Sequence, residues 1–181
     1  MRFLARDGRG AARTAALVGA VLVSLLAAGC AQADPSVVAY VGTSEITQQQ
    51  VDDAVEGVST ILQEGQTVSR AAIVNALIHG EIAEKVAAAN KITITDGERD
   101  ALIKNSNLAG LLNVPKARPV AYDVADQQIV SDKVGSAAYL TAVGEQQVTL
   151  NPRFGVLDPN QKTIIADKSA SLAEPAPTPS P

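Results

Sequence analysis

The sequence predicts a mainly helical α+β domain in which a small two-stranded antiparallel sheet pairs the N- and C-terminal ends of the domain. Apolar residues recur at helical spacing in several segments along the middle of the chain. Short runs rich in β-branched residues, 37–41 and 148–150, flank those segments. With 181 residues and 46% hydrophobic content, the chain is long enough for one domain with a proper core, but hardly for two.

The first expected strand is 37–41, which reads Val-Val-Ala-Tyr-Val and ends at Gly42. Residues 43–45 then indicate a turn. The second strand, 148–150, is followed by Asn-Pro, and a proline at the end of a strand removes no ladder hydrogen bond. Because each strand is too short to persist alone, we expect the two strands to pair with each other over the helices.

Three polar signals predict the starts of helices. Thr47 followed by Gln50, and Thr95 followed by Glu98, have the spacing of a capping box. Ser69 is a good N-cap for the segment between them. The apolar spacing then predicts helices over 47–64, with Gly65 as the C′ residue, over 69–90, and from 95 onward.

The later segments are less regular. Pro115 and Pro119 interrupt the stretch 105–121, which predicts a short helix followed by a loop. Residues 124–134 are weakly helical, and Ser136 is a candidate N-cap for a last helix. The domain is expected over 37–158. Residues 159–181, which end in Pro-Ala-Pro-Thr-Pro-Ser-Pro, are expected to form a Pro-rich disordered tail.

The N-terminus has the layout of a signal peptide. Four arginines and one aspartate precede an uncharged stretch from Ala15 to Ala28. Its 14 residues fall short of the roughly 20 that an α-helix needs to span the hydrocarbon of a bilayer. We therefore expect residues 1–29 to be removed, with 30–36 left as a short tether.

The stretch ends in Leu-Leu-Ala-Ala-Gly-Cys, residues 25–30, which resembles the bacterial lipobox. The resemblance implies that Cys30 carries acyl chains such as palmitate, and that these anchor the protein to the cell membrane on its extracytoplasmic face. The alternative is a buried, inert cysteine that happens to follow an apolar run. Cys30 is the only cysteine, so the chain has no disulfide framework and no cysteine-based metal site.

Removal of residues 1–29 leaves an acidic chain. The full sequence has 15 basic and 19 acidic residues, and the removed segment holds four arginines and Asp7. The remainder therefore has 11 basic and 18 acidic residues, a net charge of −7. Such a surface disfavours nucleic acid, and four remaining aromatic residues are too few for a base-stacking platform. We therefore expect the lipid, and not a basic patch, to hold the protein at the membrane.

Three segments resemble the N-terminal chaperone module of the SurA, PrsA and PpiD-type foldases. They are Val-Val-Ala-Tyr-Val-Gly-Thr-Ser-Glu-Ile-Thr at 37–47, Asn-Lys-Ile-Thr-Ile-Thr-Asp-Gly-Glu at 90–98, and Val-Thr-Leu-Asn-Pro-Arg-Phe-Gly at 148–155. In that family an Asn-Gly pair stands where this chain has Gly42-Thr43. The third segment is similar to actinobacterial members, and the resemblance spans about 36–158.

The resemblance implies a chaperone-like module for unfolded or nascent exported polypeptides. Many foldases insert a parvulin isomerase domain before the returning strand, but the residues between Glu98 and Val148 leave no room for one. The single histidine, His79, cannot supply the histidines of a parvulin site. We therefore expect no isomerase activity and no cofactor. One alternative is an accessory lipoprotein that docks one folded envelope partner, and another is an enzyme.

Candidate catalytic and metal-binding residues each have a simpler interpretation. His79 and Glu81 are two positions apart on a helix, so their side chains point about 200° apart; a surface or boundary histidine is favoured. Asp52-Asp53 and the group Asp96, Glu98 and Asp100 are expected in first helical turns, where carboxylates stabilise the helix N-terminus. Phe154 is expected in the core and Arg153 in solvent. The sequence therefore predicts no catalytic or metal site, and it leaves the client-binding residues unknown.

Overall fold

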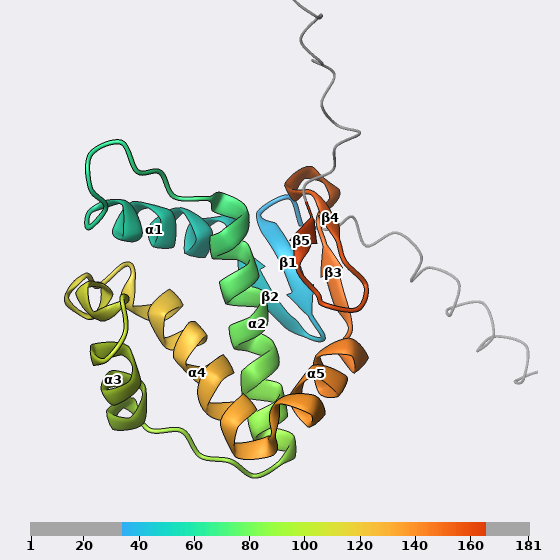
Figure 1. Ribbon diagram of the computed structural model, residues 1–181. Coiled ribbons are helices and arrows are strands. Elements are labelled where there is room, and N and C mark those ends of the chain that lie inside the picture. The colour runs from blue at the N-terminus through green and yellow to red at the C-terminus, as the bar shows by residue number, and fades with distance from the viewer. Residues whose placement is uncertain (1–33, 166–181) are drawn as a thin grey trace, which may run out of the picture. The chain divides into compact units, whose positions relative to one another are not determined.

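A computed structural model describes residues 34–165, which form one compact unit (Figure 1). The helices of this part of the chain are α1 (Gln48–Ser59), α2 (Arg70–Ala89), α3 (Asp96–Lys104), α4 (Arg118–Val134) and α5 (Ser136–Glu145), with short 3₁₀ turns at Ala109–Asn113 and Pro152–Phe154. The strands are β1 (Val37–Val41), β2 (Ser44–Thr47), β3 (Val148–Leu150), β4 (Val156–Leu157) and β5 (Ile164–Ile165).

The main sheet confirms the pairing of the two ends of the domain. Strand β1 lies between β2 and β3, and both pairs are antiparallel. Ala39 is opposite Leu150, and Asn151 extends the ladder by donating its backbone N–H to the Val38 carbonyl at 2.8 Å. Four of the five residues of β1 are buried. The central strand therefore depends on a segment more than a hundred residues away in the sequence.

The sheet has three strands in place of the expected two. Residues 44–47, of which 43–45 were expected to form a turn, are strand β2. The turn itself is the two-residue loop Gly42-Thr43, and Gly42 has a φ of +59°. A glycine at the first central position is typical of the type II′ hairpin turn, whereas Asn-Gly favours type I′. Gly42-Thr43, in place of the Asn-Gly pair of the foldase family, is therefore compatible with a tight hairpin.

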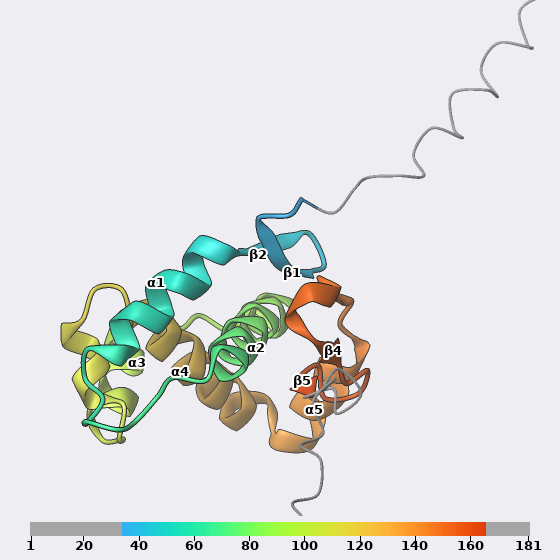
Figure 2. The same cartoon turned by 90° about the horizontal axis from the view of Figure 1, so that it is seen from above.

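Helix α2 lies at the centre of the unit, with α1, the main sheet, α4 and α5 arranged around it (Figures 1 and 2). Its nine buried residues are spread over more than one face of the helix, as expected for a helix that several elements cover. The largest of its fully buried side chains, Ile78 and Ile82, join those of β1 in the main core. A smaller cluster around Ile103 and Leu111 fills the space between α3, the first 3₁₀ turn and α4.

The predicted helix starts are confirmed at three sites and wrong at two. Thr47 and Thr95 form complete capping boxes, and Ser69 caps α2. Helix α4 begins at Arg118, inside the segment expected to be a loop. Pro119 lies in its first turn, where a proline is tolerated because a backbone N–H there would have no partner within the helix. Ser136 is the first residue of α5 and not its cap; the cap is Gly135, with a φ of +89°.

Two other boundaries differ from the prediction. Helix α1 ends at Ser59 and not near 64, so Gly65 lies in the following loop. The domain continues past residue 158, because β4 and β5 form an antiparallel hairpin that packs near α2. Residues 159–165 therefore belong to the fold and not to a tail. The remainder of the predicted tail, the signal segment and Cys30 lie outside the described residues.

Candidate functional site

Exposed apolar side chains on three helices border two neighbouring hollows. Leu102 of α3 and Val124 of α4 are each 36% exposed, and Leu140 of α5 is 68% exposed. A hollow of about 470 Å³ lies between α3 and α4, and one of about 600 Å³ lies among α2, α4, α5 and the β4–β5 hairpin. Val124 and Gln127 line both. We call the two hollows together the uncharged groove.

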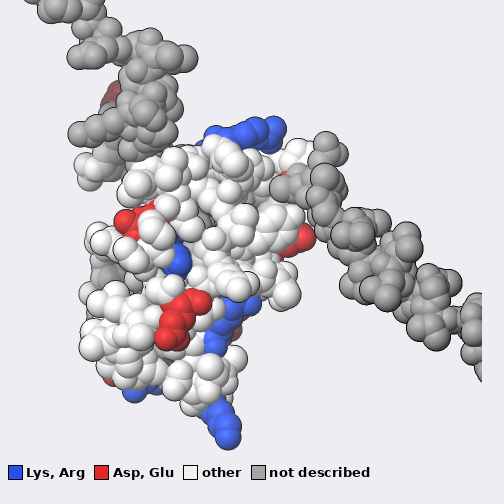
Figure 3. Space-filling view, turned by 90° about the vertical axis from the view of Figure 1, so that its right-hand side faces the viewer, with Lys and Arg blue, Asp and Glu red and all other residues white. Residues whose placement is uncertain are grey.

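The groove takes its name from its lining, which includes no lysine, arginine, aspartate or glutamate. Its polar residues are mainly amides: Asn75, Asn105, Asn107, Gln127, Gln128, Asn160 and Gln161. Side-chain amides carry a donor and an acceptor, like a peptide group. The absence of charge from this lining contrasts with the 19 acidic residues of the chain. Figure 3 likewise shows broad uncharged stretches on the face that carries α5 and the β4–β5 hairpin.

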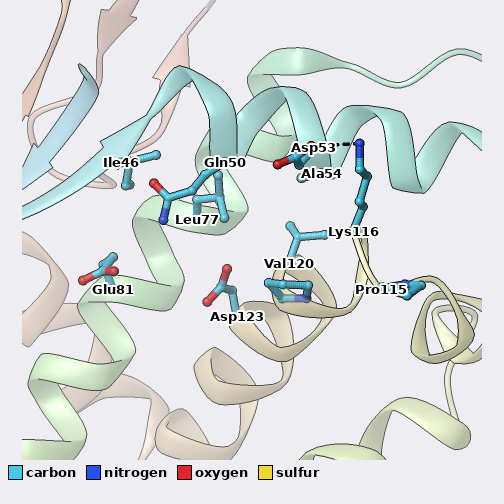
Figure 4. A pocket seen from close by; sticks show the side chains of 11 residues that line it. Ile46, Gln50, Asp53, Ala54, Leu77, Glu81, Pro115, Lys116, Val120 and Asp123 are labelled. Atoms are coloured by element: carbon cyan, nitrogen blue, oxygen red, sulfur yellow. Dashed lines mark ion pairs between the residues drawn. The ribbon is translucent and has the colours of Figure 1, made fainter. Parts of the chain in front are cut away.

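A third hollow, of about 390 Å³, lies under α1 and has a different character (Figure 4). Ile46, Leu77 and Val120 form apolar walls, and the carboxyl groups of Glu81 and Asp123 lie at its lower side. Lys116 also lines it, but its ammonium group is already paired with Asp53 at 3.0 Å and with Glu56 at 2.7 Å. The hollow therefore combines an apolar wall with two carboxyl groups that form no ion pair among the described residues.

Asp123 has the most perturbed carboxyl group of this site. Burial, followed by the charges of Glu84, Asp126 and Glu81, raises its pKa to about 8, against the opposing effect of Arg99. Near pH 7 the group is therefore mainly protonated and is able to donate a hydrogen bond. A general acid also needs a nucleophile or a bound electrophile beside it. The residues that line this hollow include no serine, threonine, cysteine or histidine.

Asp126, one turn further along α4, is buried and fully paired. It is 2% exposed, and Arg99 of α3 holds it with two hydrogen bonds, Nε to Oδ1 at 2.7 Å and Nη2 to Oδ2 at 2.9 Å. The arginine also lies over the Tyr122 ring, 5.3 Å from its centre. This bidentate pair joins α3 to α4 and is a structural element beside the hollow.

The predicted acidic groups have structural roles. Asp96 and Glu98 lie in the first turn of α3, as expected, whereas Asp100 lies beyond it. The pKa of Glu98 falls to about 2 because Lys133 and the Thr95 backbone bind its carboxylate. The Asp52-Asp53 prediction is wrong in position, since neither lies in the first turn of α1. Asp52 instead pairs with Arg70 at 2.6 Å.

The aromatic pair is placed partly as expected. Phe154 is only partly buried, packs against the main core, and has the Arg70 guanidinium 5.9 Å from its ring centre. Arg153 is exposed, and its guanidinium donates to the Pro35 carbonyl at 3.1 Å.

His79 lies on the wall of the 600 Å³ hollow. It is partly buried, as a boundary residue, but both ring nitrogens are buried with no hydrogen-bond partner among the described residues. Tyr139 of α5, which the sequence did not single out, lines the same hollow and also has an unpartnered hydroxyl group.

Comparison with protein-family models, with curated proteins and with solved structures finds no match to this chain. Among residues 34–165 there is no group of three histidine, cysteine, aspartate or glutamate side chains arranged to hold a metal ion. No helix in the same range combines the length and the apolar character needed to cross a bilayer.

Two features of these sites left a signal in the sequence. Gly80 interrupts an apolar helix, and glycine in a helix interior costs about 1 kcal/mol relative to alanine. Its position is explained by Asp123, which packs directly against it. The clusters Asn105-Ser-Asn107 and Gln127-Gln128 are uncharged polar residues next to apolar ones. Neither signal shows on its own which segments meet in space.

Proposed function

We propose that the protein is a lipid-anchored, extracytoplasmic, chaperone-like module that binds unfolded exported polypeptides without isomerase activity. The observation that carries the proposal is the uncharged groove, with exposed Leu102, Val124 and Leu140 along it. The lipobox at residues 25–30 and the resemblance to the SurA-type chaperone module support it from the sequence.

The chemistry of the groove fits an extended polypeptide. An unfolded chain presents apolar side chains together with unpaired backbone N–H and C=O groups. The leucine and valine side chains of the groove can bury the apolar side chains of the client. The groove amides can donate to and accept from its backbone groups, whatever its sequence. A lining without charge neither attracts nor repels particular charged segments. The groove therefore matches the features that all unfolded chains share.

The groove also has the exposure that binding requires. Leu140 is 68% exposed on α5, and Val124 lies on the ridge between the two hollows. Large apolar side chains concentrated on one surface mark interaction sites more often than scattered ones do. The acidic residues elsewhere on the chain keep a complex soluble through net charge.

An aggregation assay tests the proposal. A chain starting at Ala31 contains every residue that forms the described core, so it is expected to fold. At near-stoichiometric ratio it should slow light scattering by an unfolded model protein, without ATP. It should leave the rate of a proline-limited refolding phase unchanged.

Two matched variants localise the effect. Leu140→Ser removes the most exposed apolar side chain of the groove and should weaken the suppression of scattering several-fold. Ile61→Ser removes an apolar side chain that is 41% exposed but lies outside the groove, and should leave suppression unchanged. Equal suppression by both variants contradicts the groove. No suppression by the parent chain at several-fold excess favours an accessory lipoprotein with one folded partner.

A further inference from the structure

The hollow under α1 holds two carboxyl groups that have no partner in the described part of the chain. Glu81 of α2 and Asp123 of α4 lie at its lower side, and neither forms a hydrogen bond or an ion pair among residues 34–165 (Figure 4). Both residues are only partly buried, and their oxygen atoms are not among the sealed polar atoms of the fold. A ligand in the hollow can therefore reach them.

The lysine and arginine side chains near the hollow have other partners. Lys116 binds two carboxylates of α1. Arg99 binds two further carboxylates, on α3 and α4. Lys85, one turn after Glu81, donates instead to the Ser44 hydroxyl group at 3.2 Å. Within the described residues, the two carboxyl groups of the hollow are thus left without a cation.

The fold places the Asp123 carboxyl group at a cost to its own stability. Gly80 is an unfavourable residue in a helix interior, but a Cβ atom there would lie 2.4 Å from the Asp123 side chain. A half-buried carboxyl group without a partner is itself unfavourable. Natural proteins break such local rules mainly at functional sites. The combination of Gly80 and an unpartnered Asp123 therefore points to a ligand.

Helix α1 covers the hollow and is held in place at its C-terminal end. Gly57 packs so closely against the N-cap of α4 that a Cβ atom would lie 2.6 Å from the Ala117 backbone nitrogen. The two ion pairs of Lys116 join the same segments. The hollow is therefore preformed, with a volume of about 390 Å³.

The lining defines the class of ligand. Ile46, Leu77 and Val120 form an apolar wall, which fits a hydrocarbon stem. An ammonium group has three donors, so it can bind two carboxyl groups at once. A hard metal ion needs about six or more oxygen ligands, which a mainly apolar lining does not supply. An anion would be repelled by the carboxylates.

We propose that this hollow binds a primary alkylammonium group, with its stem against the apolar wall and its charge between Glu81 and Asp123. Two sources carry this chemistry, a free amine and the lysine side chain of a polypeptide. The inference goes beyond the proposed function, because the hollow shares no lining residue with the uncharged groove.

Binding of the cation should be coupled to the release of a proton from Asp123. Burial and the neighbouring carboxylates raise the pKa of Asp123 to about 8, and a bound ammonium group would lower it. The charged groups that act on Asp123 or line the same hollow are Glu81, Glu84, Asp126, Arg99, Asp53 and Lys116. Among those that shift its pKa, only Arg99 favours the ionised form. The affinity should therefore rise several-fold between pH 7 and pH 9, a range in which an alkylammonium keeps its charge.

Titration with n-butylammonium tests the proposal. The methyl groups of residues 31–181 are labelled, and the signals of Ile46, Leu77 and Val120 are followed by NMR. The matched probes are n-butanol, which has the stem without the charge, and the ammonium ion, which has the charge without the stem. Butylammonium should shift these signals and bind at least ten-fold more tightly than either probe. Equal affinities, no shift at high millimolar concentration, or an affinity that does not rise from pH 7 to pH 9 overturns the proposal.

Variants test the roles of the two carboxyl groups. Asp123→Asn, in which asparagine replaces a mainly protonated aspartate of nearly the same shape, should weaken butylammonium at least five-fold and abolish the pH dependence. Glu81→Gln should also weaken binding but keep the pH dependence. Asp132→Asn, exposed on α4 and outside the hollow, should change neither. Unchanged affinity of Asp123→Asn overturns the proposal. If that variant does not fold, Glu81→Gln and the pH dependence of the parent chain decide.

A lysine probe distinguishes the two sources of the ammonium group. If N-acetyl-lysine methylamide binds as tightly as butylammonium, the hollow accepts the lysine side chain of a polypeptide. If butylammonium alone binds, the ligand is a free amine. Leu140→Ser, outside the hollow, should leave butylammonium binding unchanged while it weakens the suppression of aggregation. The failure of one proposal is thus separate from the failure of the other.

Discussion

Gly80 of α2 and Asp123 of α4 are in direct contact where the two helices pack together. A Cβ atom on residue 80 would lie 2.4 Å from both Cβ and Oδ1 of Asp123. No flexible end of a side chain could relieve this clash, because the Asp123 Cβ is attached directly to the helix backbone. The glycine therefore sets the distance between two central helices, and it also lets a carboxyl group reach the hollow under α1.

We predict that Gly80→Ala destabilises the protein even though alanine is the better helix former. Helix propensity favours alanine by about 1 kcal/mol, but overpacking a filled contact costs about 1–3 kcal/mol and here must also displace a helix. The measurement is the free energy of unfolding in urea. Gly97→Ala in α3 is the control, because its new Cβ would meet only one atom, at 3.9 Å. Equal or higher stability of Gly80→Ala would mean that the helices do not meet as described.

The pKa of Asp123 predicts a fall in stability as pH rises from 7 to 8. Its folded pKa of about 8 lies far above its unfolded value of 3.8, so the folded state binds the extra proton. This stabilising contribution is complete at low pH and is lost as pH rises through 8. His79 acts in the opposite direction below about pH 6.5, because its folded pKa is lowered. The effect of Asp123 is therefore measured above pH 7, where His79 does not oppose it.

Asp123→Asn tests this pH dependence. Asparagine has nearly the same shape and cannot ionise, so the decrease in unfolding free energy between pH 7 and pH 8 should become flatter than in the parent chain. Asp132→Asn, at another position on α4 that faces solvent, should keep the parent slope. An unchanged slope in Asp123→Asn would show that the carboxyl group is already ionised at pH 7.

The elements and the architecture differ in how far the sequence predicted them. Thr47, Ser69 and Thr95 satisfy backbone groups a few residues away, so the starts of their helices could be read locally. The helical stretch at Arg118–Val134 was missed in part because Pro119 favours a loop unless it falls in the first turn. The β4–β5 hairpin was missed because its strands have two residues each and depend on Asn75 of α2.

The candidate sites are less predictable because they depend on distant contacts. His79 was expected at a boundary, but its unpaired state depends on α5 and the hairpin covering it. Asp123 has no distinguishing signal in the sequence. Its pKa is raised by burial, with Gly80 packed directly against it, and by the charges of Glu84, Asp126 and Glu81. Hydrophobic periodicity describes one element at a time, whereas these properties belong to pairs of elements.

We predict that Arg99→Ala is among the most destabilising substitutions of a charged residue in this protein. It would leave the Asp126 carboxylate, 2% exposed, without its bidentate partner. Removing one member of a buried ion pair costs about 3–5 kcal/mol. Lys116→Ala breaks two exposed pairs and should lower the stability much less. Urea denaturation measures both, and similar losses would mean that the Arg99 pair is solvated.

Cys30→Ala tests the proposed anchor. Without the thiol, no acyl chain can be attached, so the variant should take up no fatty-acid analogue in metabolic labelling. It should appear as an uncleaved precursor or in the soluble fraction. Ala31→Ser, the adjacent residue, should be labelled like the parent chain. Label on Cys30→Ala would contradict the lipobox interpretation.

The pairing of β1 with β3 predicts that the fold depends on residues after α5. A chain that ends at Gln146 loses β3, which pairs with Ala39, Tyr40 and Val41 in the buried central strand. It also loses Asn151, whose side chain donates to the Val37 carbonyl at 3.1 Å. Unpaired backbone groups in a buried strand are costly, so this truncation should lower the melting temperature strongly or prevent folding. A chain that ends at Ala166 keeps all these contacts and should melt like the parent. Equal melting temperatures for the two truncations would remove the paired-ends architecture, and with it the sheet that holds α2 in place beside the uncharged groove.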